Sequence, residues 1–305
     1  MVKILFIRNE KSFLPEIDAY IQYFHKFDGF QAYDSSKLLG EYNFNDFDVI
    51  WEFKGFGGVK VKNQLLIHEY ASLSTGKFPL IRNKLKVLLN HKPNLRIFLN
   101  ENVKSGFNFH DNVDFCYRDM GIDKSFLYVD KDKKEYEFVY VGLISKSRNI
   151  DQLLKAFTEK NNGKICLIGN VDNDIYNEYK NNQNLIFTGK VAYSEVPKIA
   201  SKAIYGINFI PDQYPYNIQT STKLLEYLAL DLKVITTDYQ WIRQFEKKHN
   251  CSFYKLNPTN LEFDITKISQ HEFKSNFNAN DFLWNTVIEK SQILNKINSL
   301  LSDRK

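Results

Sequence analysis

Strand-like and helix-like segments alternate at short intervals through the second half of the chain, and this order restricts the fold more than any other feature. Runs of Val, Ile, Phe and Tyr are typical of strands buried in a parallel sheet, and the segments between them have apolar residues at a helical period. The series is FVYVGLI, NIDQLLKAFTEK, KICLIGN, DNDIYNEYK, NLIFTGKV, SEVPKIASKA, YGINFIP, TKLLEYLAL, KVITTD and WIRQFEKKH. Repeated βαβ units predict an α/β domain with helices on both faces of a parallel sheet.

The first half repeats this alternation less regularly. Strand patterns at VKILFI, FDVIWEF, NQLLIHEYAS and LRIFLN are accompanied by helix patterns at PEIDAYIQYFHKF and PLIRNKLKVLLNHK. The charged stretch 129–137 reads as a linker, and a length of 305 residues suits two domains. We therefore expect two Rossmann-like, doubly wound α/β domains, residues 1–132 and 138–282. We expect residues 283–305 to form a helix that can pack back on the first domain.

Ligands of open parallel sheets bind at the carboxyl ends of the strands. If the two domains face each other across a cleft, the residues that follow their strands line it. The segment TSTKLLEYLALDLKVITTD, residues 220–238, is the most informative of these. It predicts a helix over 223–230, with Ser221 or Thr222 as the N-cap.

The charged pair at the start of this helix allows two interpretations. Lys223 and the free amides of the first turn favour a bound anion, and the Glu226 carboxylate can accept hydrogen bonds from two ribose hydroxyls. This geometry suits a nucleoside diphosphate. The simpler interpretation is an i, i+3 ion pair on a solvated face, worth about 0.2–0.5 kcal/mol. Spacing alone favours the simpler one.

The segment also resembles the donor-binding segment of GT-B glycosyltransferases, near the large retaining family 4 (glycosyl transferases group 1). That family has the pattern Pro/Thr-x-Lys-x-x-Glu-Tyr-x-Ala-x-Gly-x-Pro-Val-Ile. Further stretches agree with it in order, namely FVYVGLISKSRNIDQLLKAF, KICLIGN, NLIFTGKVAYSEVPKIASKAIYGINFIP and the closing FLW. The resemblance covers most of residues 138–300. It implies a GT-B fold, a nucleotide-diphosphate sugar as co-substrate and no cofactor or metal.

The resemblance assigns donor-site roles to single residues. It implies that Glu226 holds the ribose hydroxyls, that Arg148 contacts the diphosphate and that Gly142 ends the first strand of the domain. It implies that the loop of Thr220, Ser221 and Thr222 meets the sugar or phosphate. Arg148 and Lys223, with the helix amides, would then stabilise the leaving diphosphate.

Four positions depart from the family pattern. Asp231 and Lys233 stand where Gly and Pro are common, which we interpret as loop variation. Ile218 stands where many members have a second glutamate, and Leu143 stands where an arginine usually follows the first glycine. Lys146 or Lys223 can supply the missing charge. These departures bear on contacts to the donor sugar.

The first domain is expected to bind the acceptor. Asn9, Glu10 and Glu16 follow the first strand and can hydrogen-bond a sugar, or they can serve as helix caps and first-turn carboxylates. His68 and Glu69 end a later strand, at a position that resembles the His-x-Tyr/Asp strand end of the family. An imidazole or carboxylate there can act as a base toward an acceptor hydroxyl. The alternative is a histidine that ties a loop together, so we expect His68 to be catalytic or structural and Glu69 to contact the acceptor.

The segment FPLIRNKLKVLLNHK, residues 78–92, predicts a basic amphipathic helix. Such a helix can lie on an anionic membrane, but most pack on their own sheet. We expect packing, with the lysines free to add weak attraction to a membrane. The net charge of +5 is too small to indicate nucleic-acid binding. Three distant cysteines suggest neither a disulfide framework nor a zinc site, and no signal peptide or membrane span is evident.

Together these features predict a glycosyltransferase that moves a sugar to a glycan or lipid-linked saccharide in surface polysaccharide or lipopolysaccharide assembly. We expect it to be cytoplasmic, able to work at the inner face of the membrane. Two alternatives remain: a non-catalytic sugar-binding protein on a decayed transferase fold, and a nucleotide-sugar epimerase. Hydrolysis of a donor sugar would support the transferase, and interconversion of the sugar without acceptor would indicate the epimerase.

Overall fold

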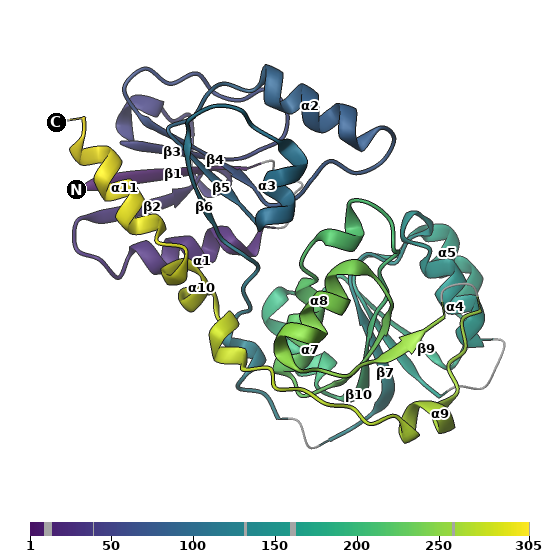
Figure 1. The fold of residues 1–305 in the computed structure, drawn as a ribbon. Helices are drawn as coiled ribbons and strands as arrows, with labels where there is room; N and C mark the ends of the chain where they lie inside the picture. Colours follow the sequence, from purple (N-terminus) through teal and green to yellow (C-terminus); the bar gives the residue numbers. More distant parts are fainter. Residues whose placement is uncertain (9–13, 39, 131–132, 159–162, 258–259, 305) are drawn as a thin grey trace. The chain divides into compact units, whose positions relative to one another are not determined.

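The computed structural model describes residues 1–8, 14–38, 40–130, 133–158, 163–257 and 260–304, so the predicted acceptor residues Asn9 and Glu10 lie outside the described residues. The chain divides into two compact units (Figure 1). The first unit comprises residues 1–121 and 283–305, and the second comprises 122–282. This division falls ahead of the charged stretch 129–137, because residues before that stretch already pack in the second unit: the ring of Phe126 lies 5.6 Å from that of Tyr193.

Within the described residues, the first unit is built on a parallel sheet of six strands in the order β2-β1-β3-β4-β5-β6. Its strands are β1 (Val2–Ile7), β2 (Phe30–Asp34), β3 (Val49–Phe53), β4 (Leu65–Tyr70), β5 (Leu95–Phe98) and β6 (Asp114–Tyr117). Its helices are α1 (Pro15–Phe24), α2 (Pro79–Leu89), α3 (Glu101–Phe107), α10 (Trp284–Lys290) and α11 (Ile293–Ser302).

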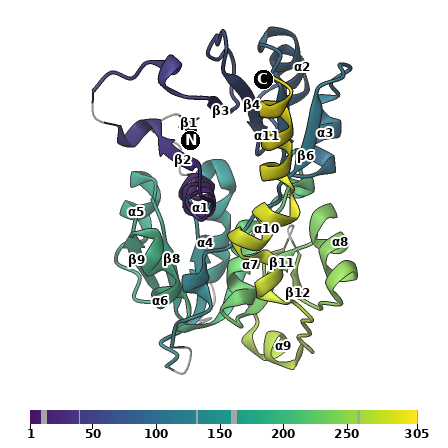
Figure 2. The same cartoon turned by 90° about the vertical axis from the view of Figure 1, so that its left-hand side faces the viewer.

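The C-terminal helices complete the core of the first unit. Ile288 of α10 and Ile293 and Ile297 of α11 are buried in one cluster with side chains from α1, β1, β3, β4 and β5. Figures 1 and 2 show both helices lying against this unit. The last residues of the chain therefore close a core that the first residues begin.

The exposed face of α2 differs from the sequence prediction. We expected the apolar side of this helix to pack on its own sheet, but Asn83 is the buried residue of the helix. Ile81, Leu85 and Leu88 are exposed, Leu88 to 77%. The helix instead docks through polar contacts. The backbone N–H of Ser74 donates to Asn83 Oδ1 at 2.9 Å, and the docked face leaves the leucines outside.

The second unit has, among the described residues, a parallel sheet of six strands in the order β12-β11-β10-β7-β8-β9. Its strands are β7 (Tyr136–Val141), β8 (Ile165–Ile168), β9 (Leu185–Gly189), β10 (Ala203–Asn208), β11 (Lys233–Thr237) and β12 (Tyr254–Leu256). Its helices are α4 (Ile150–Thr158), α5 (Asn173–Tyr179), α6 (Val196–Ala200), α7 (Thr222–Ala229), α8 (Gln240–His249) and α9 (Ile265–Gln270).

Helices cover both faces of this second sheet. Apolar residues of α4, α5 and α9 share one core cluster with alternate residues of β7, β8 and β10. Helix α7 packs on the opposite face, where the Tyr227 ring fills the space left by Gly206. The predicted pair of doubly wound α/β units is thus confirmed. Within the described residues, no helix combines the length and the apolar character that a membrane crossing requires.

Candidate functional site

The turn after β7 lies close to the end of β8 at the carboxyl edge of the second sheet. Gly142 ends the strand with a φ of 141°, a region that favours glycine. Its N–H donates to the carbonyl of Ile168 at 2.9 Å, which holds the turn beside β8. A side chain on Gly169 would collide with the Gly142 carbonyl oxygen. The two glycines therefore let the backbone of two neighbouring strands approach closely where ligands of such sheets bind.

Tyr227 anchors α7 to the end of β7. The backbone N–H of Val141 donates to the Tyr227 hydroxyl at 2.8 Å. A side chain on Gly206 would collide with the Tyr227 ring, so the glycine lets the helix lie close to the sheet. The predicted helix over 223–230 is observed as Thr222–Ala229.

A buried network positions the loop before α7. The Ser221 hydroxyl donates to Asn208 Oδ1 at 2.8 Å, and Asn208 Nδ2 donates to Thr236 Oγ1 at 3.0 Å and to the Tyr239 hydroxyl at 2.9 Å. Ser221 occupies the N-cap position, but its side chain does not cap the helix. Because the first N–H groups of a helix have no partner within the helix, this end favours an anion.

Lys223 carries a cation at the same place. Its Nζ lies 4.2 Å from the centroid of the Tyr140 ring, and a Cβ placed on Gly142 would stand 3.5 Å from it. The Nζ atom is buried and has no hydrogen-bond partner among the described residues. A buried ammonium without a hydrogen bond is costly, so Lys223 has donor capacity that the protein leaves unused.

Glu226 is buried one turn further along α7. The Tyr193 hydroxyl, from the turn η5 (Tyr193–Glu195), donates to Glu226 Oε1 at 2.7 Å. Burial raises the pKa of this carboxyl to about 7, while the Tyr193 hydrogen bond and the Lys223 charge act in the opposite direction. The interpretation as an ion pair on a solvated face is therefore wrong, because the carboxylate is buried.

The remaining donor-site predictions concern more exposed residues. Lys146 and Arg148 are exposed on η4 (Lys146–Arg148), the turn that follows Gly142. Lys146 Nζ lies 3.8 Å from Asp174 Oδ2 in an exposed pair that contributes little to stability. Thr220 and Thr222 are partly exposed on either side of Ser221. Lys146 and Arg148 thus belong to the segment after Gly142, and Thr220 and Thr222 to the segment around the start of α7.

The acceptor residues predicted in the first unit are occupied by internal contacts. Arg118 Nη2 donates to Glu69 Oε1 and lies 3.5 Å from Glu16 Oε1, while Trp51 Nε1 donates to Glu69 Oε2 at 2.9 Å. Tyr20 completes the cluster by accepting a hydrogen bond from Arg118 Nε at 3.0 Å. Both carboxylates are buried, so this arrangement does not support acceptor contacts by Glu16 or Glu69. Sequence reasoning missed Arg118, because it lies 102 positions from Glu16 and no local pattern links the two residues.

His68 faces the other side of the sheet and is fully buried. Its Nε2 lies 3.2 Å from Glu52 Oε2, and Glu52 also pairs with Lys54 and accepts the Val59 N–H. Burial lowers the pKa of His68 although the hydrogen bond to Glu52 opposes this. The imidazole is therefore neutral near pH 7. These contacts tie the sheet to the loop after β3 and leave the imidazole no surface for an acceptor hydroxyl.

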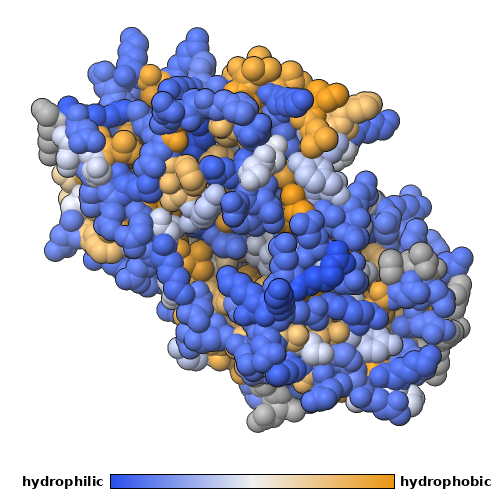
Figure 3. Space-filling model, viewed as in Figure 1, coloured by the Kyte–Doolittle hydropathy of each residue, from blue (hydrophilic) through white to orange (hydrophobic). Residues whose placement is uncertain are grey.

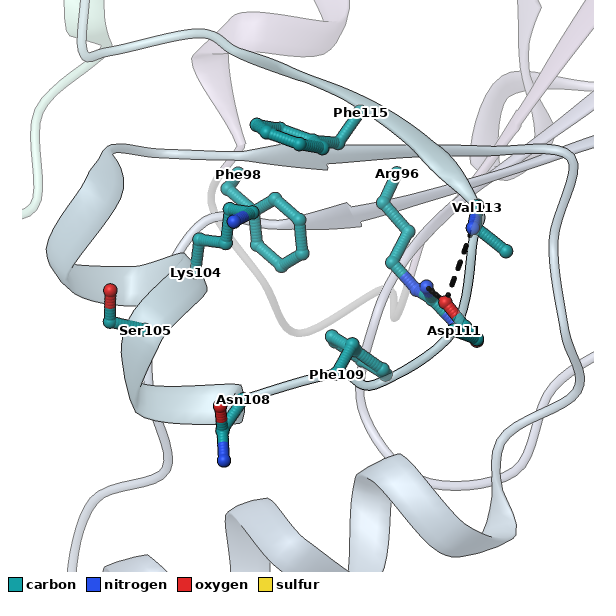
Figure 4. Close-up of a pocket in the computed structure, with 9 residues that line it drawn as sticks. All are labelled: Arg96, Phe98, Lys104, Ser105, Asn108, Phe109, Asp111, Val113 and Phe115. Carbon is teal, nitrogen blue, oxygen red and sulfur yellow. Dashed lines mark hydrogen bonds and ion pairs between the residues drawn. The ribbon is translucent and has the colours of Figure 1, made fainter.

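A hollow of about 250 Å³ lies between β5, α3 and β6 of the first unit (Figure 4). Arg96 spans it to Asp111, with Nη2 donating to Oδ2 at 2.8 Å, and its guanidinium lies 3.7 Å from the centroid of the Phe109 ring. The main charges of this hollow are thus matched inside the unit. Among the described residues, no three His, Cys, Asp or Glu side chains gather where they could hold a metal ion.

Comparison with known families identifies the class. The model of the family described as Glycosyl transferases group 1 matches residues 123–280, more than half of the chain. The protein therefore belongs to the glycosyl transferases group 1 family and is a glycosyltransferase. No curated protein matches the chain.

Solved structures agree on the fold. A crystal structure of AviGT4, a glycosyltransferase involved in avilamycin A biosynthesis, is similar with a TM-score of 0.62 at 10% identity, covering 99% of both chains. Anabaena HepE in complex with UDP and glucose has a TM-score of 0.59 at 12% identity, covering 99% of this chain and 100% of that one. Phage T4 β-glucosyltransferase with its UDP-glucose substrate has a TM-score of 0.54 at 15% identity, covering 99% and 98%. These are GT-B enzymes, and at such identities the likeness concerns the fold.

Proposed function

We propose that the edge of the second unit formed by Gly142, Lys223 and Glu226 binds the nucleoside diphosphate of a sugar donor. The observation that carries the proposal is the buried Lys223 ammonium, which has no hydrogen-bond partner among the described residues. It stands beside a glycine turn and a helix start, and both present backbone to a ligand. A diphosphate supplies the oxygens that this cation lacks.

Glu226 supports the same ligand. One of its oxygens accepts from Tyr193, and a carboxylate has capacity for further hydroxyl donors. Ribose hydroxyls one turn from the diphosphate would use that capacity. UDP occupies the similar structure of Anabaena HepE, and UDP-glucose that of the phage T4 enzyme, so we take uridine nucleotides as the first probes.

In the reaction, Lys223, Arg148 and the first amides of α7 would neutralise the charge that develops on the leaving diphosphate. Fixed donors aimed at a developing charge are a major source of rate enhancement. The leaving phosphate can itself take the proton of the acceptor hydroxyl. The reaction then needs no histidine base, which is consistent with the burial of His68 in the first unit. The acceptor we propose is a glycan or a lipid-linked saccharide of surface polysaccharide assembly.

The test is calorimetric titration of Lys223→Met with UDP and with uridine. Loss of a hydrogen bond to a charged group is worth roughly 1.5–3 kcal/mol, so UDP affinity should fall about ten- to hundredfold. Uridine affinity should not change, because uridine has no phosphate. The matched control is Lys198→Met, an exposed lysine of α6 in the same unit. Equal UDP affinities of the two variants would contradict the proposal.

Turnover separates the alternatives. Slow hydrolysis of UDP-, GDP- or dTDP-sugars, lost in Lys223→Met, would support the transferase and select the base. Nucleotide binding without any hydrolysis or transfer would indicate a sugar-binding protein on a decayed fold. Interconversion of the sugar without acceptor would indicate an epimerase.

A further inference from the structure

Helix α2 presents an apolar surface to solvent. Ile81, Leu85 and Leu88 stand at i, i+4 and i+7, which places them on one side of the helix. They are 56%, 41% and 77% exposed, and Leu80 and Leu89 flank them with comparable exposure. Phe78, just before the helix, is also exposed. Figure 3 shows hydrophobic side chains gathered over α2.

The opposite side of α2 holds it to the first unit. Besides the Asn83 contact, Asn90 Nδ2 donates to the Gly55 carbonyl at 3.1 Å, and Lys86 Nζ lies 5.6 Å from the centroid of the Phe56 ring. Asn83, Lys86 and Asn90 share one face by their i, i+3, i+7 spacing. The orientation of the helix is thus set by polar contacts, and its apolar stripe is turned outward.

Cations lie on the same helix as this stripe and just after the end of the helix. Arg82 and Lys84 are exposed on the helix itself. Directly after its end, Lys92 lines a hollow of about 590 Å³ together with Lys60, Lys62 and Arg304. No carboxylate lines this hollow within the part of the chain that the structure describes. An apolar stripe beside an unbalanced basic hollow is the pattern of surfaces that bind the interface of an anionic bilayer.

We propose that α2 and the basic hollow at its C-terminal end form a docking surface for membranes of anionic phospholipid. The exposed leucines would enter the boundary between headgroups and acyl chains, and Lys60, Lys62, Lys92 and Arg304 would contact lipid phosphates. A second copy of this chain fits less well, because the two basic hollows would face each other with like charge. This inference stands apart from the donor site, since the surface belongs to the first unit.

The experiment is flotation of the full chain with vesicles of phosphatidylcholine alone and of phosphatidylcholine mixed with phosphatidylglycerol. Binding should require the anionic lipid and weaken with salt. The triple variant Ile81→Ser, Leu85→Ser, Leu88→Ser should bind at least tenfold more weakly. The variant Lys60→Gln, Lys62→Gln, Lys92→Gln should lose roughly fivefold per removed charge at low salt.

A matched control is Lys247→Gln with Lys248→Gln, two exposed lysines of α8 in the second unit, which should bind vesicles like the unaltered protein. Urea unfolding of every variant shows whether the first unit is intact, and UDP titration reports the donor site of the second unit independently. Equal binding of all variants, or no preference for anionic vesicles, would overturn the proposal. So would a concentration-dependent dimer in sedimentation that the triple serine variant abolishes.

Discussion

The buried carboxyl of Glu226 should give the second unit a distinctive dependence of stability on pH. Its pKa rises from 4.5 to about 7 in the folded chain, and a difference of this size corresponds to roughly 3 kcal/mol. Below pH 4.5 the carboxyl is protonated in both states. Between pH 4.5 and 7 the unfolded chain loses this proton while the folded chain keeps it. The free energy of unfolding therefore falls as pH rises, and the loss is complete above the folded pKa.

Glu226→Gln isolates this effect, because the amide keeps an oxygen for the Tyr193 hydroxyl and does not titrate. Relative to the unaltered protein, the variant should be equal or about 1 kcal/mol less stable at pH 5. Its relative stability should rise by roughly 3 kcal/mol by pH 8. Urea unfolding at both pH values measures this difference. Glu195→Gln, an exposed carboxylate in the same unit, should show no such dependence.

The same substitution, Glu226→Gln, should weaken nucleotide binding at the pH at which it raises the relative stability of the chain. Ribose hydroxyls donate best to the ionised carboxylate. Glu226→Gln should therefore bind UDP about ten- to hundredfold more weakly than the unaltered protein at pH 8. This is the pH at which the ligand-free variant gains most in relative stability. UDP binding to the unaltered protein near pH 7 should release a proton, which calorimetry in two buffers of different ionisation enthalpy detects. A stability difference that is constant from pH 5 to 8 would refute the buried-acid argument. UDP affinity unaffected by the substitution would refute the ribose role.

Three further outcomes follow from the packing. Arg118→Met should lower the free energy of unfolding by about 3–5 kcal/mol in urea melts, because it leaves two buried carboxylates unpaired, yet UDP affinity should not change. Gly169→Ala should destabilise the chain by more than about 1 kcal/mol and weaken UDP binding, since its Cβ meets the Gly142 carbonyl. Burial raises the pKa of Cys116 and Cys166 to about 12, so a thiol reagent at pH 8 should modify the partly exposed Cys251 alone until urea is added.

Local pattern was sufficient to predict most of the architecture. Strands buried on both faces and helices between them have short-range signals, and β1, β3, β4 and β5 and the series from β7 to β11 lie where the sequence indicates them. The strands β2, β6 and β12 were not anticipated. They are three of the four edge strands of the two sheets, and β9, the fourth, was predicted. The short, partly exposed runs of the other three resemble loops because each strand pairs with a single neighbour.

The environment of the charged residues could not be predicted in the same way. Glu226 is buried and accepts a hydrogen bond from Tyr193, which lies 33 positions earlier in the chain. Helical periodicity does not predict such a contact. Periodicity located the amphipathic character of α2 correctly but not the side that docks. The docking side was decided by Asn83 and Asn90, whose partners lie in loops of the first unit.

Two clusters of buried charged groups, one in each unit, differ in whether their members have hydrogen-bond partners inside the fold. In the first unit, Arg118 faces two carboxylates and a tyrosine, and each of these groups has its partner inside the fold. In the second unit, the Nζ atom of Lys223 is buried without a hydrogen bond among the described residues, and Glu226 is buried with a single hydroxyl donor and a raised pKa. A folded chain gains nothing in stability from such groups. Their burial at a sheet edge that suits ligands, within the segment matched by the family, is explained if a ligand completes their hydrogen bonds.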